Sequence, residues 1–184
     1  NAVFDLQNRN LTATGATFSN DGTLKLIGSQ TITGLTPMDT NSGTVNYNGT
    51  GTYLSLVAGN NYYHVTFSGA GSSYSCGANS INVYGNFTLS AGIFISTSLT
   101  LTIAGDWDDT GGTFEHNSGT VEFTKAVGTQ TLTTQETFNN IIHSGAGTLQ
   151  LAAGVSNWYN SSWNYRRPIT ITGSTSDLTN YQIR

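Results

Sequence analysis

Asn41-Ser42-Gly43-Thr44-Val45 opens a stretch of 31 residues that closes with Ser68-Gly69-Ala70-Gly71, and both ends recur at 117–121 and 144–147. The two copies, residues 41–71 and 117–147, align at a single offset of 76 without a gap, and ten of the 31 positions are identical. An internal repeat indicates a molecule built from similar units. Each unit is a short alternating apolar run, a Gly-rich turn and a second run, which is typical of stacked β-strands.

A weaker third copy lies near residues 18–36, where Gly28-Ser29-Gln30-Thr31-Ile32 is similar to residues 128–132. Between the two main copies, Leu99-Thr100-Leu101-Thr102-Ile103 alternates apolar and polar residues with the period of a β-strand. Apolar residues do not recur at helical spacing over a useful length. We therefore expect an all-β protein with little or no helix.

Two all-β architectures fit short strands at this spacing. One is an antiparallel β-sandwich or jelly roll, and the other is a parallel β-helix or β-solenoid, in which each coil pairs with the next. The repeat favours the solenoid, because identical motifs at one offset suggest equivalent corners of stacked coils. Three pairs of apolar residues are then predicted to superpose and to face the core: Val45 with Val121, Leu56 with Leu132, and Val65 with Ile141.

The composition argues against several classes of partner. Thr, Ser, Asn and Gly make up about half of the chain, only 9% of residues are charged, and six basic residues accompany a net charge of −4. A nucleic-acid partner is therefore not expected, and no run approaches the length needed for membrane insertion. Cys76 is the single cysteine, which excludes a disulfide framework within the chain; we expect it to be buried and inert, and we predict no cofactor.

Several runs, at residues 119–123, 128–132 and 137–141, resemble the Thr/Gly-rich repeats of bacterial and archaeal adhesin-like cell-surface proteins. The resemblance covers about residues 11–155. It implies a β-solenoid, an extracellular location and a structural or adhesive role, and it implies no catalytic residues.

The end of the chain has a different character. The motif Trp163-Asn164-Tyr165-Arg166-Arg167-Pro168-Ile169-Thr170-Ile171 resembles the opening strand of a domain of unknown function that is frequent in the same class of surface proteins, and residues 177–183 resemble its second strand. We divide the chain into a solenoid repeat domain, residues 1–157, and C-terminal strands, residues 158–184. These strands either start a second module or connect one subunit to the next.

A solenoid has open edges at its ends, so it needs caps or it stacks. No capping helix is evident in the sequence, and we expect head-to-tail self-association into a filament by strand pairing. The alternative is that the tail folds back on its own body. The residues predicted to form strands between subunits are Ile169, Ile171, Tyr181 and Ile183 in the tail, and Val3, Phe4 and Leu6 near the N-terminus.

Acidic residues suggest two kinds of site. Asp106, Asp108 and Asp109 are candidate Ca²⁺ ligands, although the spacing is not that of an EF-hand; the alternative is a turn that hydrogen-bonds its own backbone. Glu115 and Glu122 are a candidate catalytic pair, but residues seven apart on a strand point to opposite faces. We predict no enzyme activity and no metal site.

Aromatic and histidine side chains are candidate ligand-binding groups. Exposed tyrosines can stack on sugar rings, but Tyr47 and Tyr62 align with Phe123 and Phe138, which argues for the core. The three histidines, at positions 64, 116 and 143, share no metal-ligand spacing. His143 aligns with Phe67 and is expected to lie inward or at an edge.

Four Asn-x-Ser/Thr sequons mark candidate glycosylation sites in a secreted chain. They begin at Asn10, Asn48, Asn86 and Asn160, and we favour Asn48 and Asn160 because both lie in predicted turns.

The sequence thus predicts an extracellular, non-enzymatic structural protein that forms a subunit or stalk segment of a surface filament or adhesin. The first alternative is a carbohydrate-binding module of a larger secreted protein, with a glycan as its ligand. A polysaccharide-processing β-helix is a third interpretation.

Overall fold

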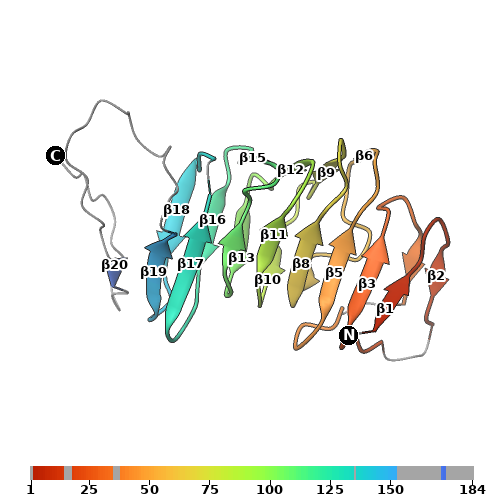
Figure 1. Ribbon diagram of the computed structural model, residues 1–184, viewed down its shortest axis with the longest axis horizontal. Coiled ribbons are helices and arrows are strands. Elements are labelled where there is room, and N and C mark those ends of the chain that lie inside the picture. Colours follow the sequence, from red (N-terminus) through yellow and green to blue (C-terminus); the bar gives the residue numbers. More distant parts are fainter. Residues whose placement is uncertain (1, 15–17, 35–37, 135, 153–170, 173–184) are drawn as a thin grey trace.

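The computed structural model describes residues 2–14, 18–34, 38–134, 136–152 and 171–172. All elements formed by these residues are β-strands. The strands stack along one long axis in a β-solenoid of about seven coils, with the N-terminal and C-terminal coils at opposite ends (Figure 1). The prediction of a parallel solenoid is confirmed, and the antiparallel sandwich is not what the chain forms.

Neighbouring coils pair strand by strand into parallel sheets. The last strand of the longest sheet, Ile171–Thr172, is antiparallel to its neighbour. The described residues form a long nine-stranded sheet, a five-stranded sheet, a four-stranded sheet and a two-stranded sheet. Along the middle of the chain, each coil visits the long, the four-stranded and the five-stranded sheet in turn, which gives the solenoid three faces.

The long sheet contains β1 (Val3–Asp5), β3 (Thr23–Leu26), β5 (Thr44–Tyr47), β8 (His64–Phe67), β11 (Phe87–Leu89), β14 (Trp107–Asp108), β17 (Thr129–Thr133), β19 (Thr148–Leu151) and β20 (Ile171–Thr172). The five-stranded sheet contains β7 (Asn61–Tyr62), β10 (Ile81–Val83), β13 (Thr100–Ile103), β16 (Thr120–Phe123) and β18 (Asn140–His143). The four-stranded sheet contains β6 (Thr52–Tyr53), β9 (Ser73–Ser75), β12 (Ile93–Ile95) and β15 (Thr113–Glu115), and the two-stranded sheet contains β2 (Leu11–Thr12) and β4 (Ile32–Thr33).

The core consists of columns of inward side chains, because alternate residues of each strand face the axis. In the long sheet, Val65 pairs with Phe87 and Phe87 with Trp107, and all three are at most 2% exposed. The rings of Phe87 and Trp107 stack with their centroids 4.2 Å apart. Each such side chain contributes about 1.5–3 kcal/mol through burial, so the columns hold one coil on the next.

The repeated Gly of the opening motif lies against the preceding coil in both copies. Gly43 has a φ of 73°, and a Cβ there would collide with the carbonyl oxygen of Asn20. A Cβ on Gly119 would likewise collide with the carbonyl oxygen of Thr97. Only glycine allows the backbones to approach this closely, which gives the shared motif a structural cause.

The predicted superposition of the two copies is wrong. Val45 lies in β5 of the long sheet, whereas Val121 lies in β16 of the five-stranded sheet. Within each copy the chain completes one coil, because Val45 pairs with Val65 and Val121 pairs with Ile141. The first copy therefore leaves the long sheet and returns to it, whereas the second copy leaves the five-stranded sheet and returns to that sheet.

The other predicted pairs fail for the same reason. Leu56 follows β6 in a loop, whereas Leu132 lies in β17, although both are buried. Ile141 continues a core column at the end of the five-stranded sheet and is 48% exposed.

Candidate functional site

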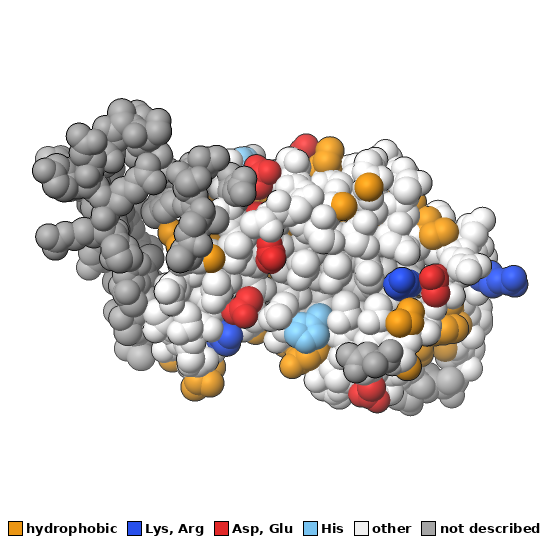
Figure 2. Space-filling view, viewed as in Figure 1, with side chains coloured by type: hydrophobic (Ala, Val, Ile, Leu, Met, Phe, Trp, Pro, Cys, Tyr) orange, Lys and Arg blue, Asp and Glu red, His pale blue; other side chains and the backbone are white. Residues whose placement is uncertain are grey.

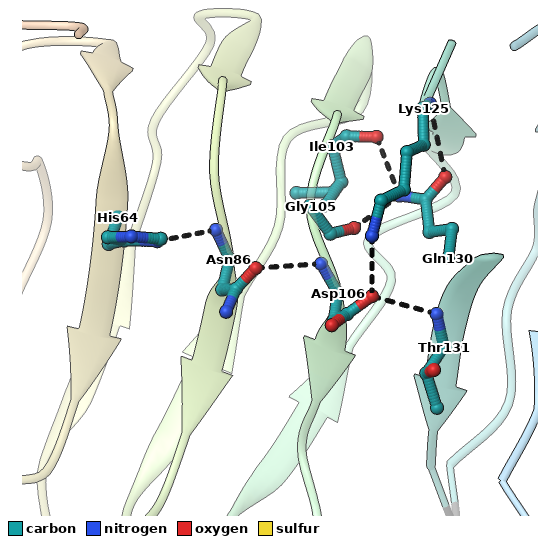
Figure 3. A network of polar contacts seen from close by, with 8 residues as sticks. All are labelled: His64, Asn86, Ile103, Gly105, Asp106, Lys125, Gln130 and Thr131. Atoms are coloured by element: carbon teal, nitrogen blue, oxygen red, sulfur yellow. Dashed lines mark hydrogen bonds and ion pairs between the residues drawn. The ribbon is translucent and has the colours of Figure 1, made fainter. Parts of the chain in front are cut away.

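The most continuous polar arrangement lies where the chain enters the long sheet in successive coils. Here the side chain of one coil accepts the backbone N–H of the next: Asn86 N donates to His64 Nδ1 at 2.8 Å, and Asp106 N donates to Asn86 Oδ1 at 2.9 Å. Thr131 N then donates to Asp106 Oδ1 at 2.9 Å (Figure 3). We call His64, Asn86, Asp106 and Thr131 the corner ladder.

An ion pair and a buried glutamine extend the ladder at Asp106. Lys125 Nζ lies 3.4 Å from Asp106 Oδ1, with both side chains partly exposed, so the pair itself adds little stability. Gln130 is completely buried, accepts a hydrogen bond from Lys125 N at 3.3 Å, and donates to the carbonyl oxygens of Ile103, at 2.9 Å, and Gly105 (Figure 3). Its amide thus ties one coil to the previous one.

Gln30 has a similar role near the N-terminus. Its side chain is 4% exposed, accepts from Gly28 N at 2.8 Å and donates to the Gln7 carbonyl oxygen at 2.6 Å. Sequence reasoning missed both glutamines as structural residues, although the shared Gly-x-Gln-Thr pattern at 28–31 and 128–131 was the available signal.

The three aspartates proposed as Ca²⁺ ligands do not converge. Asp106 belongs to the corner ladder, and Asp108 accepts hydrogen bonds from the backbone and side chain of Thr110. Asp109 is buried and accepts from Trp107 Nε1 at 2.9 Å and Thr134 Oγ1 at 2.7 Å. Within the described residues, no three His, Cys, Asp or Glu side chains gather as a metal site would require.

Two further acidic residues occupy different sheets. Glu115 lies in β15 and Glu122 in β16. A third acidic residue, Glu136, has a raised pKa. Burial is the larger cause, and the negative charge of Asp109 is the second.

The three histidines lie in separate environments. His64 belongs to the corner ladder, and His116 Nδ1 accepts a hydrogen bond from Ser118 N at 3.0 Å. His143 continues the column that contains Phe123, at the last described coil of the five-stranded sheet. Burial lowers the pKa of His64 and of His143, which favours their neutral forms. Cys76 is buried, as expected, and burial raises the pKa of its thiol to about 12.

The tyrosines divide into a core set and a surface set. Tyr47, Tyr62 and Tyr74 are fully buried, and the hydroxyl groups of Tyr47 and Tyr62 lie 3.0 Å apart in a hydrogen bond. The prediction that Tyr47 and Tyr62 belong to the core is thus confirmed. Tyr84 is 52% exposed and Tyr63 is half-buried. Tyr53 is also half-buried, but its ring stacks on that of Tyr74 with the centroids 4.9 Å apart.

The sequons lie at different depths. Asn10 and Asn86 are exposed, and their Oδ1 atoms accept the N–H groups of Thr31 and Asp106. Asn48 is half-buried just after β5, beside a shallow depression of about 340 Å³. Asn160 lies outside the described residues.

The structure describes some of the residues that were predicted to form strands between subunits. Val3 and Phe4 are 56% and 49% exposed in β1, whereas Leu6 is buried. Ile171 pairs antiparallel with Leu149 of the same chain, as expected if the tail folds back on its own body. Ile169, Tyr181 and Ile183 lie outside the described residues.

Comparison with protein-family models, with curated proteins and with solved structures finds no match to this chain. Among the residues described, none forms a helix that is apolar and long enough to cross a membrane.

Proposed function

We propose that this chain is a structural rod segment of an extracellular surface protein, and that copies associate end to end into a filament. The observation that supports this proposal is the state of the core at the two ends of the solenoid. At the N-terminal end, Phe4 pairs with Leu24 and continues its column, yet Phe4 is 49% exposed while Leu24 is fully buried.

The N-terminal end also offers a recess for an incoming side chain. Val3, Phe4 and Phe18 line a depression of about 400 Å³ beside Gly22 and Thr23. Among the described residues, β1 pairs only with β3, so its second edge is free to accept a strand.

The C-terminal end is open in the same sense. Ile141 continues the column of Leu101 and Val121, but its exposed fraction is 48% against 2% for Val121. β18 is the last described strand of its sheet, and β20 ends the long sheet. A second copy placed with its N-terminal end here would bury both columns.

The tail supports strand addition, because β20 already adds to a solenoid edge within the chain. Ile171 and Thr172 pair with Leu149 and Thr148 of β19. We propose that the outer edge of β20 meets the free edge of β1 of the next copy. Contacts between unlike ends do not close on themselves, so they extend into a filament.

Sedimentation velocity and negative-stain microscopy of the full chain test the proposal. Ile141→Asp and Phe4→Asp should each lower the fraction of polymer at least ten-fold, because each places a charge at one end of the rod. Val127→Asp and Leu54→Asp are matched controls, since both parent side chains are 79% exposed and neither continues a core column at an end; these variants should assemble like the parent chain.

Two results would contradict the proposal: a parent chain that stays monomeric at every concentration, or end variants that polymerise as well as their controls. Deleting residues 164–184 separates the contribution of the tail. If the shortened chain polymerises like the full chain, the tail is not the connector.

A further inference from the structure

The central coils carry no charged side chain. Residues 40–105 contain no Asp, Glu, Lys or Arg, and they include every strand from β5 to β13. Figure 2 shows acidic and basic side chains on both sides of a central region that is white, orange and pale blue. We call residues 40–105 the uncharged belt. A ligand that contacts its outer surface meets amides, hydroxyl groups and aromatic rings instead of charges.

Two tyrosines form a step on the outside of this belt. Asn61 and Tyr62 pair with Asn82 and Val83 in neighbouring coils, and Tyr62 and Val83 face the core. The next residues, Tyr63 and Tyr84, follow in the same register at the corner that leads into the long sheet.

The step is open on one side. Tyr84 is 52% exposed, and the following coil has the small residue Ala104 at this position, with Ala104 N donating to the Val83 carbonyl oxygen. Neighbouring strands lie about 4.8 Å apart, so the two tyrosines are close enough to act on one extended ligand.

Hydrogen-bonding groups flank the rings. Asn82 Nδ2 donates to Asn61 Oδ1 at 2.9 Å, which orders both amides on the outer face of the five-stranded sheet. The His64 ring contacts the Tyr63 ring edge-on, with centroids 4.4 Å apart. Because His64 Nδ1 accepts the Asn86 N–H, its neutral ring carries the proton on Nε2, which is then a fixed donor.

We propose that the Tyr63–Tyr84 step, with Asn61, Asn82 and His64, binds a neutral polysaccharide. A pyranose ring has an apolar C–H face that packs on an aromatic ring, and a rim of hydroxyl groups that pair with amides and imidazole. Tyrosine suits this contact because it combines an apolar face with a polar tip. The uncharged belt supplies no cation for an acidic polysaccharide and no anion for a basic protein, so the chemistry favours a neutral chain.

Affinity electrophoresis of the full chain tests the site. The gels contain, one at a time, soluble neutral polysaccharides that differ in linkage: a β-1,4-glucan, a β-1,3-glucan, an α-1,4-glucan and a mannan; polygalacturonate is the acidic comparison. At least one neutral gel should retard the parent chain, and polygalacturonate should not. Tyr84→Ala and Tyr63→Ala should each weaken that retardation at least ten-fold, and Tyr84→Phe should retain most of it.

Leu99→Ala is the matched control, because Leu99 is 50% exposed, lies in the same belt and precedes a strand of the same sheet. Circular dichroism confirms that each variant is folded. The proposal is overturned if no neutral polysaccharide retards the parent chain, if Leu99→Ala weakens retardation as much as Tyr84→Ala, or if Tyr84→Ala changes only self-association. The site does not depend on end-to-end assembly. A chain that stays monomeric and still binds the polysaccharide would therefore contradict the proposed filament and support the polysaccharide site.

Discussion

Leu101 and Leu99 show that the period-two pattern predicts burial only where the strand actually forms. Leu101 lies inside β13 and is fully buried, whereas Leu99 lies one residue before the strand begins and is 50% exposed. Leu101→Ala should lower the free energy of unfolding by about 2–5 kcal/mol, because it leaves a cavity in a core column. Leu99→Ala should cost less than about 0.5 kcal/mol. Urea unfolding measures both, and equal losses would contradict the burial of Leu101.

His64 should make stability depend on pH. Burial lowers its pKa in the folded state below the ordinary value of 6.5, so the unfolded chain binds more protons in the window just below 6.5. Stability from this residue is therefore fully present above about pH 6.5 and is lost as the pH falls through that window.

His64→Gln is the variant that tests this dependence, since an amide oxygen can still accept the Asn86 N–H and does not titrate. Thermal unfolding between pH 7.5 and pH 5 should show a smaller loss of stability for His64→Gln than for the parent chain. His143 remains in both proteins and, because burial also lowers its pKa, contributes the same background slope. Identical pH profiles would show that His64 is not held neutral.

At the scale of elements, the corner ladder replaces part of the strand pairing where the chain bends into the long sheet. Asp106 accepts the Thr131 N–H and pairs with Lys125. Asp106→Ala should lower the free energy of unfolding by about 1 kcal/mol, since the Thr131 N–H loses its acceptor. Asp106→Asn keeps an acceptor and should recover most of this loss.

Asp108→Ala is the control for the ladder, because Asp108 is exposed and its carboxylate accepts hydrogen bonds from Thr110 within its own turn. Chemical unfolding of the three variants compares them directly. If Asp108→Ala cost more than Asp106→Ala, the bond between coils would not be the stabilising one.

At the scale of the whole molecule, stability should not require a metal ion. The side chains of Asp106, Asp108 and Asp109 each accept hydrogen bonds from different protein groups. We expect a chelator to leave the melting temperature unchanged in calorimetry. A fall of several degrees that Ca²⁺ reverses would show that an ion belongs to the folded protein.

The whole molecule also divides along its axis into regions of different chemistry. Charged residues lie before residue 40 and after residue 105, and the uncharged belt separates them. We propose that the two ends of the rod bind further copies of the chain and that the uncharged belt binds a neutral polysaccharide.

The class of structure and the orientation of most side chains can be predicted from the amino-acid sequence alone. Alternation in stretches such as 100–103 separates core from surface without reference to the rest of the fold, because successive side chains of a strand point to opposite sides. The buried state of Tyr47 and Tyr62 followed from their apolar counterparts in the second copy. The repeated motif that contains Gly43 and Gly119 predicted corners of stacked coils, and the structure adds that both glycines lie against the preceding coil.

The face that each strand occupies cannot be predicted in this way and is known only from the folded chain. The register separates successive coils by 20 residues between Phe87 and Trp107, but by 25 between Trp107 and Leu132. An offset of 76 is therefore not a whole number of coils, and it moves Val121 to a different sheet from Val45. Face assignment depends on the summed lengths of all intervening turns and on backbone pairing between coils, and neither quantity is contained in the repeated motif itself.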